Sequence, residues 1–113
     1  MERRNPGILM ARFDVRPNLH KSSREQVPYL LEIQSDLLSG LGTRLVAPLV
    51  QASKFGPAAE RLNPLFRVAG KNYIMDTALI AGVSARILGE AVANLSDNST
   101  EILVAIDFLI SGI

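Results

Sequence analysis

The sequence contains no cysteine, and this absence excludes a disulfide-stapled scaffold and metal sites built from thiolates. It also lacks any continuous apolar run near the ~20 residues that a membrane-spanning helix needs, so we expect no membrane association. The formal net charge of +1 is too even to supply the concentrated basic field that nucleic-acid binding requires. We therefore expect a soluble, cytoplasmic protein that makes no direct, specific contact with nucleic acid.

The remaining composition is that of an ordinary globular protein, with 48% hydrophobic and 20% charged residues. A length of 113 residues suits one hydrophobic core rather than two. Residues 1–9 carry the turn-prone cluster Asn5-Pro6-Gly7, whereas a strand-like pattern begins at Met10. We therefore predict a disordered N-terminal extension at residues 1–9, followed by a single domain over residues 10–113.

Most of this domain has the pattern of short β-strands. Alternating apolar residues and turn-forming loops predict strands over residues 10–16, 27–33, 45–50, 65–68, 73–75 and 85–88. Pro48 lies inside the third of these segments and indicates an edge strand or a strand end there. The tetrapeptide Ala69-Gly70-Lys71-Asn72 predicts a hairpin between the fourth and fifth.

Residues 98–113 form the clearest predicted element, an α-helix. Asp97, Asn98 and Ser99 are residue types that cap helix N-termini, and Glu101 lies in the first turn, where the helix dipole favours a carboxylate. Gly112 is predicted to be the left-handed residue that ends the helix. The fold class is therefore mainly β with a C-terminal α-helix.

This helix is apolar on all sides. One face carries Ile102, Ile106, Leu109 and Ile110. The opposite face carries Leu103, Val104 and Phe108. A surface helix normally has a polar face, and one small core cannot cover both apolar faces. We therefore expect part of the helix to meet a second subunit or another partner, with Ile102 and Ile106 on the core side.

Residues with catalytic potential show no motif spacing. His20, the only histidine, lies in a polar loop and is interpreted as a solvated surface residue rather than a general base. The segment Gly40-Leu41-Gly42-Thr43-Arg44 faintly resembles a phosphate-binding loop but lacks its ending, so it predicts a turn. The scattered carboxylates are expected at solvent-facing strand ends and caps: Glu32, Asp36, Asp76, Glu90 and Asp107. We expect no enzyme activity, no catalytic residue, no metal ion and no cofactor.

Four segments together resemble the CcdB family, the toxin halves of CcdA/CcdB toxin–antitoxin pairs. They are EIQSDLL at residues 32–38, TRLVAPL at 43–49, GEAVANLS at 89–96 and AIDFLISGI at 105–113. The segments lie in the family's order and spacing, so the resemblance spans most of the domain. The stretches at 17–26 and 51–62 match poorly.

The resemblance implies a small, partly open antiparallel β-barrel of the CcdB, Kid and MazF toxin type, assembled as a homodimer. It implies that the dimer binds the A subunit of DNA gyrase, traps the cleaved-DNA complex and is neutralised by a CcdA-like antitoxin. By motif match the gyrase-binding residues would be Ser111, Gly112 and Ile113. Leu109 and Ile110 would lie in the dimer interface.

One departure from the family leaves alternatives open. The best-known pattern has a tryptophan where Ser111 stands, and loss of such an anchor commonly costs ~2 kcal/mol or more of binding free energy. One alternative is a non-toxic remnant that only dimerises and binds a flexible, acidic antitoxin segment. The other is a MazF/Kid-like endoribonuclease, because those toxins resemble CcdB in fold yet cleave RNA. The base and acid of this reaction could come only from His20, Arg12 and Arg44 with a nearby carboxylate. The Gly-x-Arg-Pro strand start of MazF is missing, because Leu45 follows Arg44.

Overall fold

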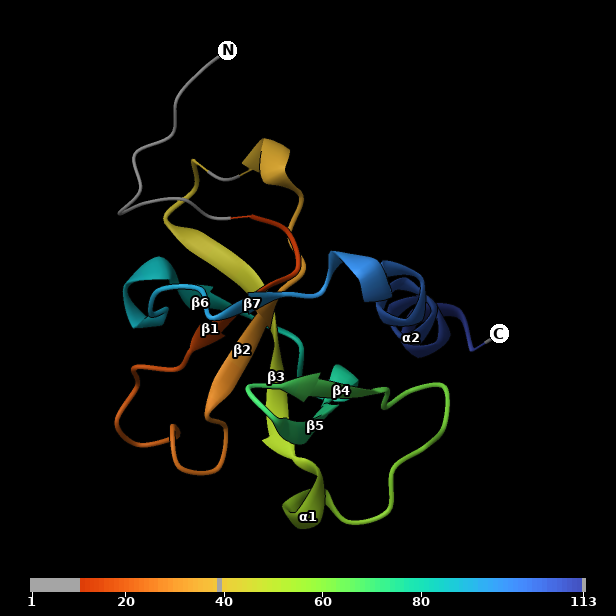
Figure 1. Ribbon diagram of the computed structural model, residues 1–113. Helices are drawn as coiled ribbons and strands as arrows, with labels where there is room; N and C mark the ends of the chain where they lie inside the picture. Colours follow the sequence, from red (N-terminus) through yellow and green to blue (C-terminus); the bar gives the residue numbers. More distant parts are fainter. Residues whose placement is uncertain (1–10, 39, 113) are drawn as a thin grey trace.

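The chain folds into a mainly antiparallel β-sheet that nearly closes into a barrel, with a C-terminal helix packed on one side (Figure 1). The computed structural model describes residues 11–38 and 40–112, so the extension expected at residues 1–9 lies outside the described part. The fold class expected from the sequence is confirmed.

Seven strands form the sheet in the order β4-β5-β3-β2-β1-β7, and β6 also pairs with β3. The strands are β1 Asp14–Pro17, β2 Tyr29–Glu32, β3 Thr43–Gln51, β4 Leu65–Val68, β5 Lys71–Met75, β6 Ala81–Ser84 and β7 Ala93–Asn94. The helices are α1 Ala52–Phe55 and α2 Ser99–Ser111. Short 3-10 turns lie in the connections between elements: η2 Asp36–Leu38, η3 Thr77–Leu79, η4 Ala85–Ile87 and η5 Ser96–Asn98.

Pro48 does not mark an edge or a strand end, as its sequence context suggested, but lies in the central strand β3. This strand pairs with β2 along one side, and along the other with β6 over its first half and β5 over its last three residues. The carbonyl of Pro48 accepts a hydrogen bond from Asp76 N at 2.9 Å, on the side where β6 gives way to β5. The nitrogen of Pro48 points the same way, into the gap between two partners, so the missing N–H breaks no ladder.

The strand expected over residues 85–88 is also wrong, because this segment is the 3-10 turn η4. The Ser84 side chain accepts a hydrogen bond from Arg86 N at 3.2 Å and so closes a tight turn. Leu88 N then bonds to Ala85 O at 3.2 Å. A local side-chain acceptor thus outweighs the apolar pattern of the segment.

The two faces of the central strands are both buried, and they differ in chemistry. One face meets α2 in the main core, which is composed of Phe13, Val15, Leu31, Ile33, Ala47, Leu49, Phe66, Val68, Tyr73, Met75, Leu95, Ile102 and Ala105. The other face carries a small apolar cluster of Leu30, Val46 and Leu88. Beside this cluster lie the charged residues Asp14, Arg16, Glu32 and Arg44, all of them buried.

Glu32 is fully buried, which corrects the expectation that it lies at a solvent-facing strand end. One carboxylate oxygen accepts from Arg16 Nε at 2.7 Å, and the other accepts from Arg44 Nε at 2.6 Å. Arg16 also binds Asp14 at 3.0 Å. Each neighbouring strand therefore supplies a cation to Glu32, and β1, β2 and β3 are joined by charge as well as by backbone. A single buried ion of this kind would be unstable without those partners.

The β4–β5 hairpin turns at Ala69 and Gly70, which have φ angles of 51° and 80°. Both values lie in the left-handed region, as the central residues of a type I′ turn require. Glycine adopts this conformation freely, whereas an L-alanine pays a steric penalty from its Cβ. The hairpin predicted from the sequence is confirmed, with strain at its first turn residue.

We predict that Glu32→Gln destabilises the protein by about 3 kcal/mol or more, because the neutral amide leaves the buried guanidinium of Arg44 without its counter-charge and, among the described residues, leaves Arg16 with Asp14 as its acidic partner. Urea unfolding followed by circular dichroism measures the loss. Glu25→Gln removes the same charge from an exposed loop and is expected to change stability by less than about 0.5 kcal/mol. Equal effects of the two variants would contradict the role given to Glu32.

We predict that Ala69→Asn stabilises the fold by about 0.5–1 kcal/mol, because asparagine tolerates the left-handed conformation better than alanine. For a domain of this size the melting temperature would rise by about 2–6 °C in calorimetry. Ala58→Asn makes the same change at an exposed position without positive φ, and no rise is expected there. A lower melting temperature for Ala69→Asn would show that the turn is not strained.

Candidate partner-binding surface

The helix α2 is held by only part of its surface. Ile102 and Ala105 are fully buried, and Ile106 packs half-buried against the same core. The assignment of Ile102 and Ile106 to the core side is therefore confirmed. Its other apolar side chains are exposed by the following fractions: Leu103 41%, Val104 44%, Leu109 42% and Ile110 78%.

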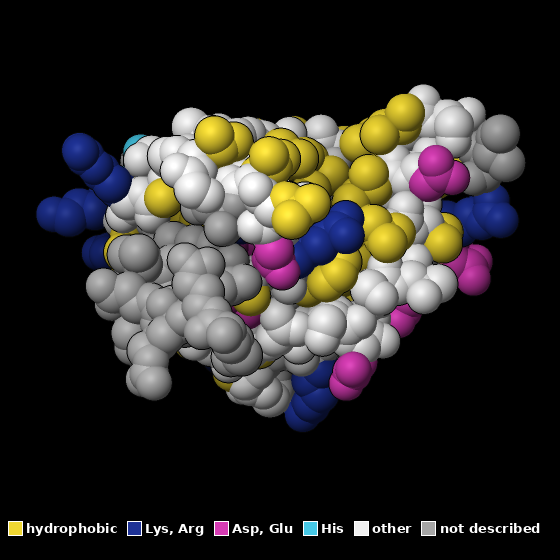
Figure 2. Space-filling model, turned by 90° about the horizontal axis from the view of Figure 1, so that it is seen from above, with side chains coloured by type: hydrophobic (Ala, Val, Ile, Leu, Met, Phe, Trp, Pro, Cys, Tyr) yellow, Lys and Arg dark blue, Asp and Glu magenta, His cyan; other side chains and the backbone are white. Residues whose placement is uncertain are grey.

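These side chains belong to a broader apolar surface. Figure 2 shows hydrophobic side chains crowded on the side of the molecule where α2 lies, with acidic and basic groups among them. A shallow hollow runs along the helix between Thr100, Leu103, Val104, Ile106, Asp107 and Ile110. Exposed apolar groups that form a continuous area typically mark an interaction site. Leu109 and Ile110, expected at a dimer interface, are accessible to a partner.

The last turn of α2 ends as the sequence predicts. Gly112 is left-handed with a φ of 72°, and its N–H donates to Phe108 O at 2.9 Å. Ser111 is exposed, and its hydroxyl donates to Asp107 O at 2.7 Å. The Ser111 hydroxyl therefore donates its proton within the helix, so its oxygen can accept a hydrogen bond from a partner but cannot donate one. Ile113, the third expected gyrase-binding residue, lies outside the described residues.

The start of α2 differs in detail from the expectation. Asn98 takes the N-cap position, but its side chain makes no capping hydrogen bond. Instead, Asn98 Nδ2 donates to Glu101 Oε1 at 3.0 Å, which fixes the acidic side chain beside the first turn. The 3-10 turn η5 leads directly into α2, so the backbone already has a helical conformation where α2 begins.

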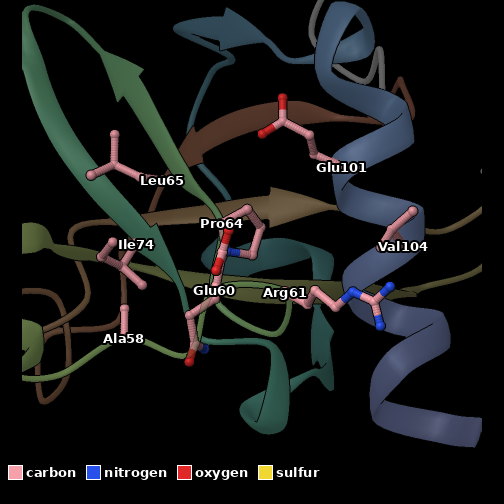
Figure 3. A pocket seen from close by; sticks show the side chains of 9 residues that line it. Ala58, Glu60, Arg61, Pro64, Leu65, Ile74, Glu101 and Val104 are labelled. Atoms are coloured by element: carbon pink, nitrogen blue, oxygen red, sulfur yellow. The ribbon is translucent and has the colours of Figure 1, made fainter. Parts of the chain in front are cut away.

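A second hollow separates α2 from the loop that precedes β4 (Figure 3). It is lined by Ala58, Glu60, Arg61, Asn63, Pro64, Leu65, Ile74, Glu101 and Val104. Leu65 and Val104 offer apolar surface from the two sides, while Arg61 reaches across toward the helix. The guanidinium carbon of Arg61 lies 5.8 Å from the centre of the Phe108 ring. No pattern in the sequence indicated that this loop approaches α2.

A further exposed apolar group lies around η2, a segment for which no strand or helix was predicted. Leu37 is 93% exposed, and Leu38 and Leu41 are about half exposed. The Asp36 side chain accepts from Arg12 N at 2.6 Å and so ties this segment to the chain that leads into β1. The sequence feature that could have indicated this group is the pair of adjacent leucines, Leu37 and Leu38, in a turn-forming segment. Neither side chain is needed in the core.

The residues considered for RNA cleavage are not gathered in one open site. Arg44 is fully buried and bound to Glu32. His20 is exposed in its loop, where Nδ1 lies 2.8 Å from Ser22 Oγ, as expected for a surface histidine. Arg12 donates from Nε to Ile33 O at 3.2 Å. Of the turn predicted over residues 40–44, the structure confirms a turn and bends at 40–42, whereas Thr43 and Arg44 already belong to β3.

Two groups have pKa values shifted by their surroundings. Burial raises the pKa of Tyr73, and repulsion from the neighbouring Tyr29 raises it further. Burial also raises the pKa of Asp76. Neither residue lines the hollows beside α2. In the described part of the chain, no group of three acidic, histidine or cysteine side chains is placed to hold a metal ion, and no helix is long and apolar enough to cross a bilayer.

The comparison with known protein families agrees with the fold and with the exposed C-terminal helix. The family model described as CcdB protein matches residues 12–112, which is almost the whole chain. The match covers the buried charged residues of β1 to β3, both hollows and the α2 turn at Ser111 and Gly112. The chain therefore belongs to the CcdB family, toxins of toxin–antitoxin pairs of the gyrase-poison type.

Proposed function

We propose that this protein binds the A subunit of DNA gyrase through the C-terminal turn of α2 and traps the complex in which the DNA is cleaved. A cognate CcdA-like antitoxin then reverses this action. The protein acts as a binding module in this mechanism and performs no chemistry of its own, because gyrase itself breaks the DNA.

The observation that carries the proposal is the exposure of the last turns of α2 in a chain of this family. Among the described residues beyond Ile106, only Phe108 is half-buried, and the others are exposed. No hydrogen bond or ion pair joins residues 107–112 to another described element. A helix end that a protein leaves uncovered in this way is well suited to insertion against a partner.

The serine at position 111 sets the strength of this interaction. Tryptophan anchors bury a large flat surface, whereas Ser111 is small and its proton is committed to Asp107 O. The binding energy must then come from several smaller contacts. We therefore propose that each contact of this protein with gyrase contributes less binding energy than a tryptophan at this position would.

A homodimer fits the same surface. Leu103, Val104, Leu109 and Ile110 are too exposed for a helix that functions alone. A two-fold dimer would cover part of this area and would present two identical helix ends, which matches a two-fold target. We place Leu109 and Ile110 at this interface and Ser111, Gly112 and Ile113 at the gyrase contact. The cytoplasm, where gyrase and the antitoxin are found, is the proposed location.

The direct test is removal of residues 111–113. We predict that the full-length protein stops growth of a gyrase-sensitive host and accumulates cleaved DNA in a supercoiling assay. The truncated protein is predicted to lose at least tenfold in affinity for the gyrase A subunit, because the contact residues are gone. Its circular dichroism spectrum should be unchanged, since Ser111 and Gly112 are exposed.

Two outcomes would redirect this proposal. A harmless full-length protein that forms no complex with the gyrase A subunit, yet binds an acidic antitoxin peptide, would select a non-toxic remnant. Specific cleavage of single-stranded RNA, lost on Arg44→Met with the fold retained, would select an endoribonuclease.

The dimer is tested by charge insertion. We predict that the double variant Leu109→Asp and Ile110→Asp is monomeric in light scattering, because two carboxylates cannot be desolvated in an apolar interface. Thr100→Asp adds a charge to the exposed first turn of the same helix and should leave the dimer intact. A monomeric wild-type protein at micromolar concentration would refute the assignment.

A further inference from the structure

We propose that Arg61 is a positioning residue that holds the C-terminal turn of α2 in place for its partner. This inference rests on the proposed function for its consequence in binding, but its structural part stands separately. It concerns a residue of the loop before β4, which lies far from Ser111 in the sequence.

The need for such a residue follows from how α2 is attached. The helix is anchored to the core through Ile102, Ala105 and Ile106, all of which lie in its first two-thirds. Beyond them, the described chain makes no hydrogen bond or ion pair with another element. A terminal turn without external contacts frays readily, and ordering it costs conformational entropy when it binds.

Phe108 is the half-buried residue in this part of the helix, which makes no hydrogen bond with another described element, and Arg61 lies against its ring. The guanidinium carbon is 5.8 Å from the ring centre, within the distance at which a cation is attracted to an aromatic face. Figure 3 shows the Arg61 side chain extending from its loop toward α2. Arg61 makes no hydrogen bond or ion pair with any described residue, although Glu60 and Glu101 line the same hollow. Among the described residues, the Phe108 ring is therefore the one group with which the Arg61 guanidinium interacts.

The loop that carries Arg61 is itself well anchored. The hydroxyl of Thr77, which is fully buried, donates to Leu62 O. Asn63 Nδ2 donates to Met75 O at 3.1 Å, and Asn63 N bonds to Ala59 O at 2.8 Å. The two residues that follow Arg61 are thus tied to η3 and β5, and Ala59, which precedes it, is bonded to Asn63. A cation on an anchored loop can restrain a helix end, whereas one on a free loop would move with it.

The first experiment measures the free protein and does not depend on gyrase. Hydrogen exchange of the amides at residues 107–112 is compared in the wild type, Arg61→Ala, Arg61→Lys and Arg67→Ala. Arg67 is an exposed residue of β4 and provides the matched loss of one positive charge. We expect exchange to rise about two- to five-fold in Arg61→Ala, with lysine restoring part of the protection and Arg67→Ala having no effect.

The second experiment measures binding to the gyrase A subunit. Arg61→Ala should weaken binding by about two- to five-fold, and Arg61→Lys by less. In a Phe108→Leu background, Arg61→Ala should add nothing beyond the effect of Arg67→Ala, because the ring is absent. All variants should keep the wild-type melting temperature to within a few degrees, since Arg61 is exposed.

The outcomes separate this inference from the proposed function. Unchanged exchange in Arg61→Ala, or an effect that persists fully in Phe108→Leu, overturns the positioning role. A wild-type protein that does not bind the gyrase A subunit overturns the proposed function, while the exchange result still decides whether Arg61 restrains the helix end.

Discussion

The fold depends on a carboxylate that cannot be exposed to water or left alone. Glu32 is fully buried, and its two oxygens are bound by arginines from the strands on either side. Shifting β1 or β3 by one residue would turn Arg16 or Arg44 to the opposite face, into the apolar core. The buried carboxylate of Glu32 would then lose that partner. The ion pairs thus specify the register of the three strands. This register in turn places Val15, Leu31 and Ala47 on the face that receives α2.

The sequence predicted elements whose signals are local and missed those that depend on distant neighbours. The C-terminal helix, its glycine cap and the hairpin at Ala69 follow from periodicity and turn chemistry within a few residues. Glu32 looked solvent-facing because its two cations lie 16 and 12 residues away. Pro48 looked like a strand end because the switch of partners from β6 to β5 is not visible in the sequence. The helix surface was foreseen, whereas the Arg61 loop and the leucines of η2 were not, since only tertiary structure places them.

The two ends of α2 differ in how firmly they are held by the rest of the protein. Its first turns are fixed by the core and by Asn98 at Glu101, while its last turns rely on the ring of Phe108. Ser111 offers no large side chain, so in the proposed gyrase contact the presentation of the backbone and of the smaller groups matters more. The effect of a sequence change in the last turn of α2 therefore has to be considered together with the loop that carries Arg61.

The pairing of β1 with β7 has a consequence for synthesis of the protein. Asp14 pairs with Asn94, and Asn94 Nδ2 bonds back to Asp14 and to Arg12 O across 80 or more residues. Contacts of such long range form late, and the core stays open until Ile102 and Ala105 have been added. A ribosome that stops before Asn94 therefore releases a chain with neither a closed sheet nor a docked helix. A chain cut short there also lacks α2 and cannot present the exposed surface of this helix to a partner.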